Sequence, residues 1–407
     1  ENTKRGIVYF QSIDDKKQCV GVYLGGNLLF DEEKMPHTFS GMRTWKYSES
    51  LHGEDVEFGW LLSDGADLEK VCPEELKPQF EKACARMRAY KKSFELAKID
   101  FNSHCFYDLV PHDFLTLFLD IKNKITEHVF ENYEKPENYD HLRDAHKLIS
   151  KIRQQNLNIN SDDCRHIFVR SVHRGSAQKL LQGLKNINYN LFGTVTGRLT
   201  TNSPSVPILT MHRELRQLIK PQNDWFLSLD YNGAELRTAL ALSGQKQPDY
   251  DIHEWNMENV FQSGYVNDRA TAKTLFFSWL YNPDSNAITS DVYKREKIVD
   301  NHYDGEKVKT IFGRNIVADQ YRAFNYIIQS TTSDLVIEKA VEIDKFLENH
   351  QSFVSHIVHD EIVIDLVNSE RELAPQIREI FGDTRLGKYL VNLEAGADYY
   401  NMEKLKI

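Results

Sequence analysis

The strongest constraint on this chain is a pair of aspartates, each at the edge of an apolar run with the composition of a β-strand. Asp360 lies in the run Val358–Ile364, and Asp230 lies far upstream between Leu229 and Tyr231. Carboxylates at strand ends are the groups that hold divalent cations against phosphate oxygens. One aspartate at a strand edge is more often ordinary turn chemistry. The pair therefore needs support from other segments.

That support comes from residues 269–281, where cations and aromatic rings recur every four residues: Arg269, Lys273, Phe277 and Tyr281. The segment lacks helix breakers until Asn282-Pro283, so it is predicted to be a helix. Residues four apart advance about 400° around a helix and drift only about 40°, so these four side chains should share one face. The face is either an amphipathic core stripe with two incidental cations or a surface for a triphosphate and a stacked base. Beside two candidate metal ligands, the pattern indicates nucleotidyl transfer.

Charge distribution gives a second indication of nucleic acid. The net charge is −10, yet residues 141–190 hold nine Lys and Arg against three acidic residues. Such a basic stretch is either a phosphate-tracking surface or a solvated helix face.

Length and composition set the outer limits. A chain of 407 residues with 41% hydrophobic content can bury a large core and is expected to form two to four domains. No apolar run approaches the length of a membrane span, so no membrane partner is expected. The five cysteines are scattered and never spaced as CxxC, which favours a reduced, cytoplasmic compartment and argues against zinc.

The N-terminal part is predicted to begin with short strands at residues 6–10, 19–23 and 27–30, with Gly25-Gly26 as a hairpin turn. An acidic, loop-rich stretch is expected from residue 52 to about 75. Helices are expected from Pro78 onward and at residues 114–133 and 139–154.

Six motifs, in order, carry a family resemblance: Thr196-Gly-Arg-Leu199, Asp230-Tyr-Asn-Gly-Ala-Glu-Leu-Arg237, Asp251-Ile-His253, Arg269–Tyr281, Asn325-Tyr-Ile-Ile-Gln329 and His359-Asp-Glu361. With these motifs the chain resembles the family A DNA polymerases, of which bacterial DNA polymerase I is the best-known example. The resemblance covers about residues 186–407, and residues 1–95 carry none.

The resemblance implies an α+β right-hand polymerase fold with an antiparallel palm sheet, a helical thumb and short fingers, plus a small N-terminal α/β region. The expected divisions are 1–95 for the N-terminal region, without a complete exonuclease domain, 96–190 for the thumb, 191–250 for the first part of the palm, 251–312 for the shortened fingers and 313–407 for the second part of the palm. Asp55-Val-Glu57 has the DxE form of an exonuclease, with Asp108 as a possible partner, but an active exonuclease is not expected.

The resemblance also implies the metal chemistry. Asp230 and Asp360 would ligate two Mg²⁺ ions, with Mn²⁺ as a substitute, and the Tyr231 backbone carbonyl would add a ligand. Glu361 would lie near the metals in a secondary catalytic role. Lys273 would give a proton to the departing pyrophosphate.

The remaining site residues follow the same resemblance. Those implied to bind the incoming dNTP are Arg269, Lys273, Phe277, Tyr281, His253 and Glu235, the last as the group that excludes a ribose 2′-hydroxyl. Those implied to bind DNA are Arg198, Arg216, Asn325, Gln329 and His359.

Some positions depart from the family pattern. Ser278 and Asn282 stand where the family has glycine, Gly233-Ala234 replace the usual Gln-Ile, and Tyr321 stands where an arginine is usual. The end of the fingers helix and the handling of the template are therefore expected to differ.

The function expected from the motifs is template-directed DNA synthesis in replication or repair, with primer–template DNA and dNTPs as partners. Two alternatives stay open: an enzyme like the single-subunit RNA polymerases, against which Glu235 argues, and a non-catalytic DNA-binding relative. The compact form suggests a phage-encoded protein acting in the cytoplasm of a bacterial host.

Overall fold

The chain divides into two compact units, Glu1–Arg143 and Asp144–Ile407. The boundary falls inside the segment expected to be the thumb, so the domain ranges remain predictions. The computed structural model describes residues 7–15, 18–36, 39–46, 55–101, 103–160, 180, 183–261, 266, 268–282, 284, 285, 288 and 291–405.

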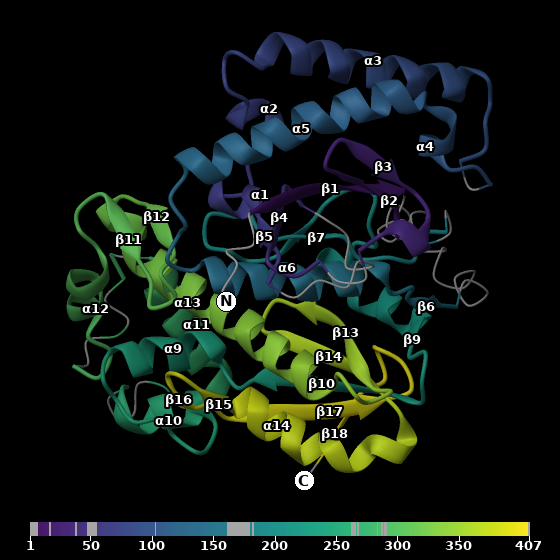
Figure 1. Ribbon diagram of the computed structural model, residues 1–407. Helices are drawn as coiled ribbons and strands as arrows, with labels where there is room; N and C mark the ends of the chain where they lie inside the picture. The colour runs from purple at the N-terminus through teal and green to yellow at the C-terminus, as the bar shows by residue number, and fades with distance from the viewer. Residues whose placement is uncertain are drawn as a thin grey trace, which may run out of the picture. The chain divides into compact units, whose positions relative to one another are not determined.

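The first unit contains a five-stranded sheet with the order β3-β2-β1-β4-β5 (Figure 1). The three predicted N-terminal strands are confirmed as an antiparallel meander, and Gly25 and Gly26 turn between β2 and β3 with positive φ. Strands β4 and β5 run parallel to β1. The bounds are β1 (Val8–Asp15), β2 (Gln18–Leu24), β3 (Asn27–Leu29), β4 (Met42–Thr44) and β5 (Glu57–Phe58).

Two long helices, α3 (Lys77–Leu96) and α5 (His112–Asn132), pack together in this unit, as predicted from their apolar spacing. Helix α5 contacts the sheet and buries Leu115, Ile125 and Val129. The expectation of a loop from 52 to 75 is wrong for its described part. That part contains β5 and the short helices α1 (Gly59–Leu62) and α2 (Leu68–Val71), because single-turn elements leave no periodic pattern. Helix α4 spans Phe106–Leu109.

The second unit is built on an antiparallel sheet with the order β13-β14-β10-β17-β18, here called the aspartate sheet. Strands β10 (Trp225–Tyr231) and β14 (Glu361–Leu366) pair so that Asp230 lies opposite Glu361. The antiparallel sheet predicted for the two aspartate segments is thus confirmed. The other strands are β13 (Phe353–Val358), β17 (Val391–Gly396) and β18 (Glu403–Lys404).

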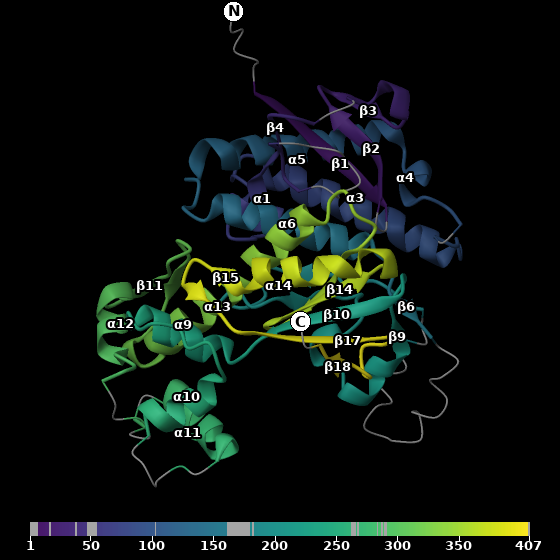
Figure 2. The ribbon, with the colours of Figure 1, turned by 90° about the horizontal axis from the view of Figure 1, so that it is seen from below.

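Two helices, α13 (Gln320–Phe346) and α14 (Ala374–Gly382), cover one face of the aspartate sheet (Figures 1 and 2). Helix α13 is the longest in the described part of the chain. Its length lets one end contact β13 while the other lies among the helices described next.

A second apolar core joins four helices and a hairpin: α9 (Ala234–Leu242), α10 (Ile252–Asn259), α11 (Arg269–Tyr281), α12 (Arg295–His302), and β11 (Lys307–Lys309) with β12 (Asn315–Val317). Together with the first part of α13, these elements bury Leu240, Phe276, Trp279, Tyr293 and Phe324. Because α9 follows β10 directly, this core is tied to the end of the strand that carries Asp230.

Helix α6 (Tyr139–Gln154) has the predicted bounds. Beyond it, part of the basic stretch at 141–190 lies outside the described residues, including Arg165, Arg170, Arg174 and Lys179. Short strand pairs complete the second unit: β6 (Asn158–Ile159) with β9 (Ile219–Lys220), β7 (Tyr189–Asn190) with β8 (Thr200–Thr201), and β15 (Asp383–Thr384) with β16 (Gly387–Lys388). No helix in the described part of the chain is long and apolar enough to span a membrane.

Candidate active site

A cavity of about 520 Å³ opens where the aspartate sheet meets α9, α10, α11 and α13; it is called the aspartate cavity below. Most of the residues singled out from the sequence meet here. Those lining the cavity are Arg198, Asp230, Tyr231, Glu235, His253, Arg269, Lys273, Phe277, Tyr281, Gln329, His359 and Asp360.

The two aspartates reach the cavity from adjacent strands. Asp230 is the penultimate residue of β10, and Asp360 lies in the two-residue turn between β13 and β14. His359, the other turn residue, has φ 58°, a left-handed conformation that His adopts more readily than most residues. Burial and the charge of Asp360 raise the pKa of Asp230 to about 7, and burial raises the pKa of Asp360. Two half-buried carboxylates with raised pKa values form a site that favours bound positive charge.

The oxygen ligands at this cavity fit a hard divalent cation whose coordination is completed by substrate. Among the residues that the structure describes, no cation donates a hydrogen bond to Asp230 or Asp360, and Asn392 Nδ2 donates to Asp230 Oδ2 over 3.4 Å. Within the described residues, no group of three or more His, Cys, Asp or Glu forms a complete metal site. Mg²⁺ is commonly held by one or two carboxylates, with the remaining ligands coming from substrate phosphates and water.

Helix α11 has the predicted bounds. One of its faces packs in the apolar core, and the opposite face lines the cavity. Ala272, Phe276 and Trp279 are buried in the apolar core. The opposite face turns Arg269, Lys273, Phe277 and Tyr281 to the cavity. The rings of Phe277 and Tyr281 are parallel within 10°, with centroids 5.9 Å apart. The predicted shared face is therefore present, and it is a cavity wall.

Glu235 is held at the base of the cavity by two partners. Tyr281 Oη donates to Glu235 Oε2 over 2.6 Å, and Arg198 Nη2 pairs with Glu235 Oε1. Burial raises the pKa of Glu235, and the Tyr281 hydrogen bond and the Arg198 charge oppose that rise. The side chain is only 8% exposed, so its carboxylate is fixed in one place.

Gly233 explains one departure from the family pattern. It is the N-cap of α9 with φ 70°, a conformation that strongly favours glycine. A Cβ added there would lie 2.6 Å from Ile252 Cγ2. A larger residue at 233 would force α9 and α10 apart.

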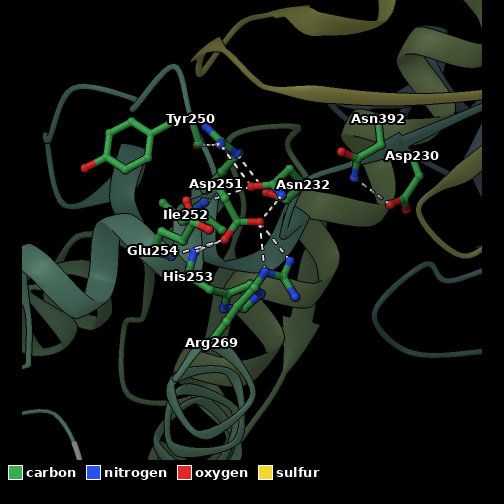
Figure 3. Close-up of polar contacts among 10 residues, drawn as sticks. Asp230, Asn232, Tyr250, Asp251, Ile252, His253, Glu254, Arg269 and Asn392 are labelled. Atoms are coloured by element: carbon green, nitrogen blue, oxygen red, sulfur yellow. Dashed lines mark hydrogen bonds and ion pairs between the residues drawn. The ribbon is translucent and has the colours of Figure 1, made fainter. Parts of the chain in front are cut away.

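A polar cluster lies at the entry of α10 (Figure 3). Asp251 caps the helix by accepting from the backbone N–H groups of His253 and Glu254, and it forms an ion pair with Arg269. Burial alone would raise the pKa of Asp251, but hydrogen bonds from Arg269 and Asn232 hold it well below its ordinary value. Burial and the charge of Arg269 lower the pKa of His253 to about 4, so this imidazole is neutral at pH 7.

Three of the predicted residues lie outside the aspartate cavity. Glu361 accepts from Ser228 Oγ (2.6 Å) and Tyr399 Oη (2.8 Å), so both of its oxygens are engaged behind the cavity wall. The Arg216 guanidinium lies over the Tyr399 ring, 4.7 Å from its centroid. Asn325 lines a separate cavity beside Tyr281. Their roles remain predictions.

The loop that carries Arg198 is supported from α13 and the β11–β12 hairpin. Ser333 Oγ donates to the Gly197 carbonyl over 3.0 Å. A Cβ on Gly197, which has φ 75°, would lie 2.5 Å from the Arg314 guanidinium carbon, and Arg314 is itself paired with the buried Asp334. Arg198 therefore reaches Glu235 from a fixed backbone.

Sequence reasoning gave no role to Asn232, Asp251 or Asn392. Asp251 had a readable signal, because an aspartate directly before the first residue of a helix is a typical N-cap. Asn392 lies on β17, and its approach to Asp230 depends on strand pairing across the sheet. No pattern in the local sequence predicts that contact.

Comparison with known proteins gives matches at the level of sequence and of fold, although no protein-family model matches the chain. DNA polymerase I of Chloroflexus aurantiacus is 26% identical over 279 residues, which cover 55% of this chain and 30% of the relative. The thermostable DNA polymerase I of Thermus aquaticus is 24% identical over 292 residues, covering 58% and 34%. The chain thus spans about a third of the length of these relatives.

Among solved structures, the POL domain of Pol1 from M. smegmatis, in complex with DNA primer-template and dNTP, matches with a TM-score of 0.67 and 11% identity. The match covers 98% of this chain and 96% of that one. The α+β polymerase fold expected from the sequence is therefore confirmed.

Fold and sequence matches together define the class: the chain is a polymerase-fold protein. Over about half of its length its sequence is similar to bacterial DNA polymerases I, in line with the motif resemblance.

The raised pKa of Asp230 generates a prediction about stability. Because the folded-state pKa of Asp230 is raised, ionising it should destabilise the fold increasingly from about pH 4 to about pH 7 and fully above that. In a chelator at pH 8, Asp230→Asn should raise the free energy of unfolding by about 2 kcal/mol. The gain should shrink at pH 5, and added Mg²⁺ should stabilise the parent more than the variant. Thermal unfolding measures both effects, and a variant that is less stable than the parent at pH 8 would contradict this view of the site.

Proposed function

We propose that this chain is a template-directed DNA polymerase that adds dNTPs to a primer 3′ end. The observation that carries the proposal is the convergence of the aspartate pair, the cation-bearing face of α11 and the fixed Glu235 in one cavity. Each group serves a different part of the same substrate: the reacting phosphate, the triphosphate tail and the sugar.

Asp230 and Asp360, with the Tyr231 carbonyl, are the groups that would hold two Mg²⁺ ions, or Mn²⁺ in their place. Bound there, these cations would lower the pKa of the primer 3′-hydroxyl and neutralise charge on the phosphates. The protein's own part is to keep two half-buried carboxylates at one cavity, which the pairing of β10 with β14 supports.

Arg269 and Lys273 lie one turn apart on α11 and would bind the triphosphate of the incoming nucleotide. The Lys273 ammonium also provides an acid for the departing pyrophosphate. His253, neutral in the free protein, would donate a hydrogen bond to the phosphates, and their negative charge would favour protonation of its ring.

Phe277 and Tyr281 form a flat surface for the nascent base pair. Arg198 and Gln329 lie at the same cavity and would contact minor-groove acceptors, which all correct base pairs present in similar positions. Such contacts test the shape of the pair without reading its sequence.

Glu235 would lie beneath the sugar. Its carboxylate cannot turn away without breaking its contacts to Tyr281 and Arg198. A ribose 2′-hydroxyl would therefore meet a fixed group, which discriminates against rNTPs by exclusion.

No nuclease function is assigned to the Asp55-Val-Glu57 segment. Arg43 Nε donates to Glu57 Oε2 over 2.8 Å, and Lys135 Nζ donates to Oε1 over 3.2 Å. A carboxylate engaged by two cations is a poor metal ligand, which supports the expected lack of exonuclease activity in this segment.

The direct test substitutes the two aspartates separately. Asp230→Ala and Asp360→Ala should each lower nucleotide incorporation at least about a thousandfold, because they act on charge that develops during transfer. Primer–template affinity should change less than about threefold, because phosphate contacts elsewhere dominate it. Rapid-quench extension and fluorescence anisotropy measure the two quantities. Near-normal extension by either variant in Mg²⁺ would remove the metal-site assignment.

The two cations of α11 should differ in their kinetic effects. Lys273→Ala should reduce kcat by about a hundredfold or more, since its proposed roles are strongest during transfer. Arg269→Ala should mainly raise the KM for dNTP, by about tenfold or more, since it binds the triphosphate tail before and during transfer. Single-nucleotide extension over a range of dNTP concentrations separates the two, and the reverse pattern would refute this division of roles.

Sugar selection separates the DNA polymerase from an RNA polymerase-like enzyme. Glu235→Ala should raise the relative use of rNTPs by about a hundredfold or more, because the group that meets the 2′-hydroxyl is gone. Glu235→Gln, which keeps the volume, should raise it much less. Parallel extension with dNTPs and rNTPs gives the ratio. A parent protein that uses rNTPs as readily as dNTPs would favour the RNA polymerase alternative.

A further inference from the structure

Asp251 makes more contacts than are needed to cap α10. Arg269 donates to Asp251 Oδ2 from both Nε (3.1 Å) and Nη2 (2.8 Å), although the two residues lie on different elements. Asn232 Nδ2 donates to the same oxygen over 2.8 Å. The other oxygen, Oδ1, accepts from the backbone N–H groups of His253 and Glu254. One carboxylate thus joins the strand of Asp230, the start of α10 and the start of α11 (Figure 3).

Asp251 is itself held in place from α9. The Arg237 guanidinium is completely buried and donates to the carbonyls of Asn232, Pro248 and Tyr250, each over 2.8 Å. Asn232 Oδ1 accepts from the Ile252 N–H over 2.8 Å. The backbone on both sides of Asp251 is therefore anchored to residues that follow Asp230 directly in the chain.

The guanidinium of Arg269 keeps donors for a ligand. A guanidinium has five N–H groups, and Asp251 takes one from Nε and one from Nη2. Nη1 donates to no described residue, and Arg269 lines the aspartate cavity with its side chain half exposed. A triphosphate can therefore bind Arg269 while the pair with Asp251 persists.

We propose that Asp251 is a positioning residue of the triphosphate site, which fixes the Arg269 guanidinium at the cavity with its free edge available to phosphate. The proposal rests on the proposed function for the identity of the ligand. The Asp251 carboxylate would thereby strengthen the binding of the triphosphate anion, whereas its negative charge alone would weaken it.

That reversal makes Asp251→Asn a decisive variant. Asn keeps the size and the helix-capping ability of Asp but loses the ion pair. If only charge matters, removing a negative group beside an anion site should tighten nucleotide binding. If Asp251 positions Arg269, the variant should raise the KM for dNTP by about tenfold, with kcat changed less than about threefold. Asp251→Ser, which also caps helices, should show the same loss.

Asp268→Asn is the matched control. Asp268 caps α11 by accepting from the Thr271 N–H, lies next to Arg269 in sequence and makes no ion pair with it among the described residues. Its substitution removes one negative charge from the end of α11 that carries Arg269, and it should not weaken nucleotide binding.

A double substitution separates positioning from general damage. In an Arg269→Ala background there is no guanidinium to position, so adding Asp251→Asn should leave the KM unchanged or lower it. An equal further loss in that background would overturn the proposal, as would an Asp251→Asn protein that binds dNTP as tightly as the parent or more tightly.

Calorimetric titration with inorganic tripolyphosphate and Mg²⁺, without DNA, gives a readout that is independent of polymerisation. The parent and Asp268→Asn should bind with similar affinity, and Asp251→Asn about tenfold more weakly. If the parent extends no primer, the proposed function fails, and the titration still decides the role of Asp251. Equal tripolyphosphate affinity of parent and Asp251→Asn overturns the positioning role whatever the extension assay shows.

Discussion

The placement of two half-buried carboxylates in one cavity is the constraint on which this site depends. Asp230 and Asp360 come from segments far apart in the sequence, and the pairing of β10 with β14 forces them into one cavity. Without a cation, ionising these groups is unfavourable, because burial and the charge of Asp360 raise the pKa of Asp230 and burial raises the pKa of Asp360. The surrounding sheet must therefore be stable enough to hold them together, and helices α13 and α14 pack on its face.

The two arginines of the cavity are paired with carboxylates other than Asp230 and Asp360. Arg269 is paired with Asp251, and Arg198 is paired with Glu235. Each arginine thus has a carboxylate that fixes it, so Asp230 and Asp360 stay available for metal. Without these partners, the arginines would be free to pair directly with Asp230 and Asp360.

The local sequence pattern was sufficient to predict the helix Arg269–Tyr281 and the face that its cations and rings share. Side chains that recur every four residues lie on one face of an α-helix. The pattern was also sufficient for the N-terminal strands, whereas the antiparallel pairing of the aspartate segments was expected from the family resemblance. It missed β5, α1 and α2, which are too short to show a period. It could not reveal that Arg198 pairs with Glu235, or that Ser228 and Tyr399 engage Glu361, since those contacts arise from tertiary packing between distant segments.

The most direct test of the account is to locate the cations and the triphosphate in a ternary complex. Crystals of the chain with a dideoxy-terminated primer, its template, the complementary dNTP and Mn²⁺ would show the metal by anomalous scattering. Anomalous peaks are expected between Asp230 and Asp360. The triphosphate is expected on Arg269 and Lys273, with Arg269 still paired with Asp251. Peaks at other carboxylates, or a triphosphate bound away from α11, would contradict the account.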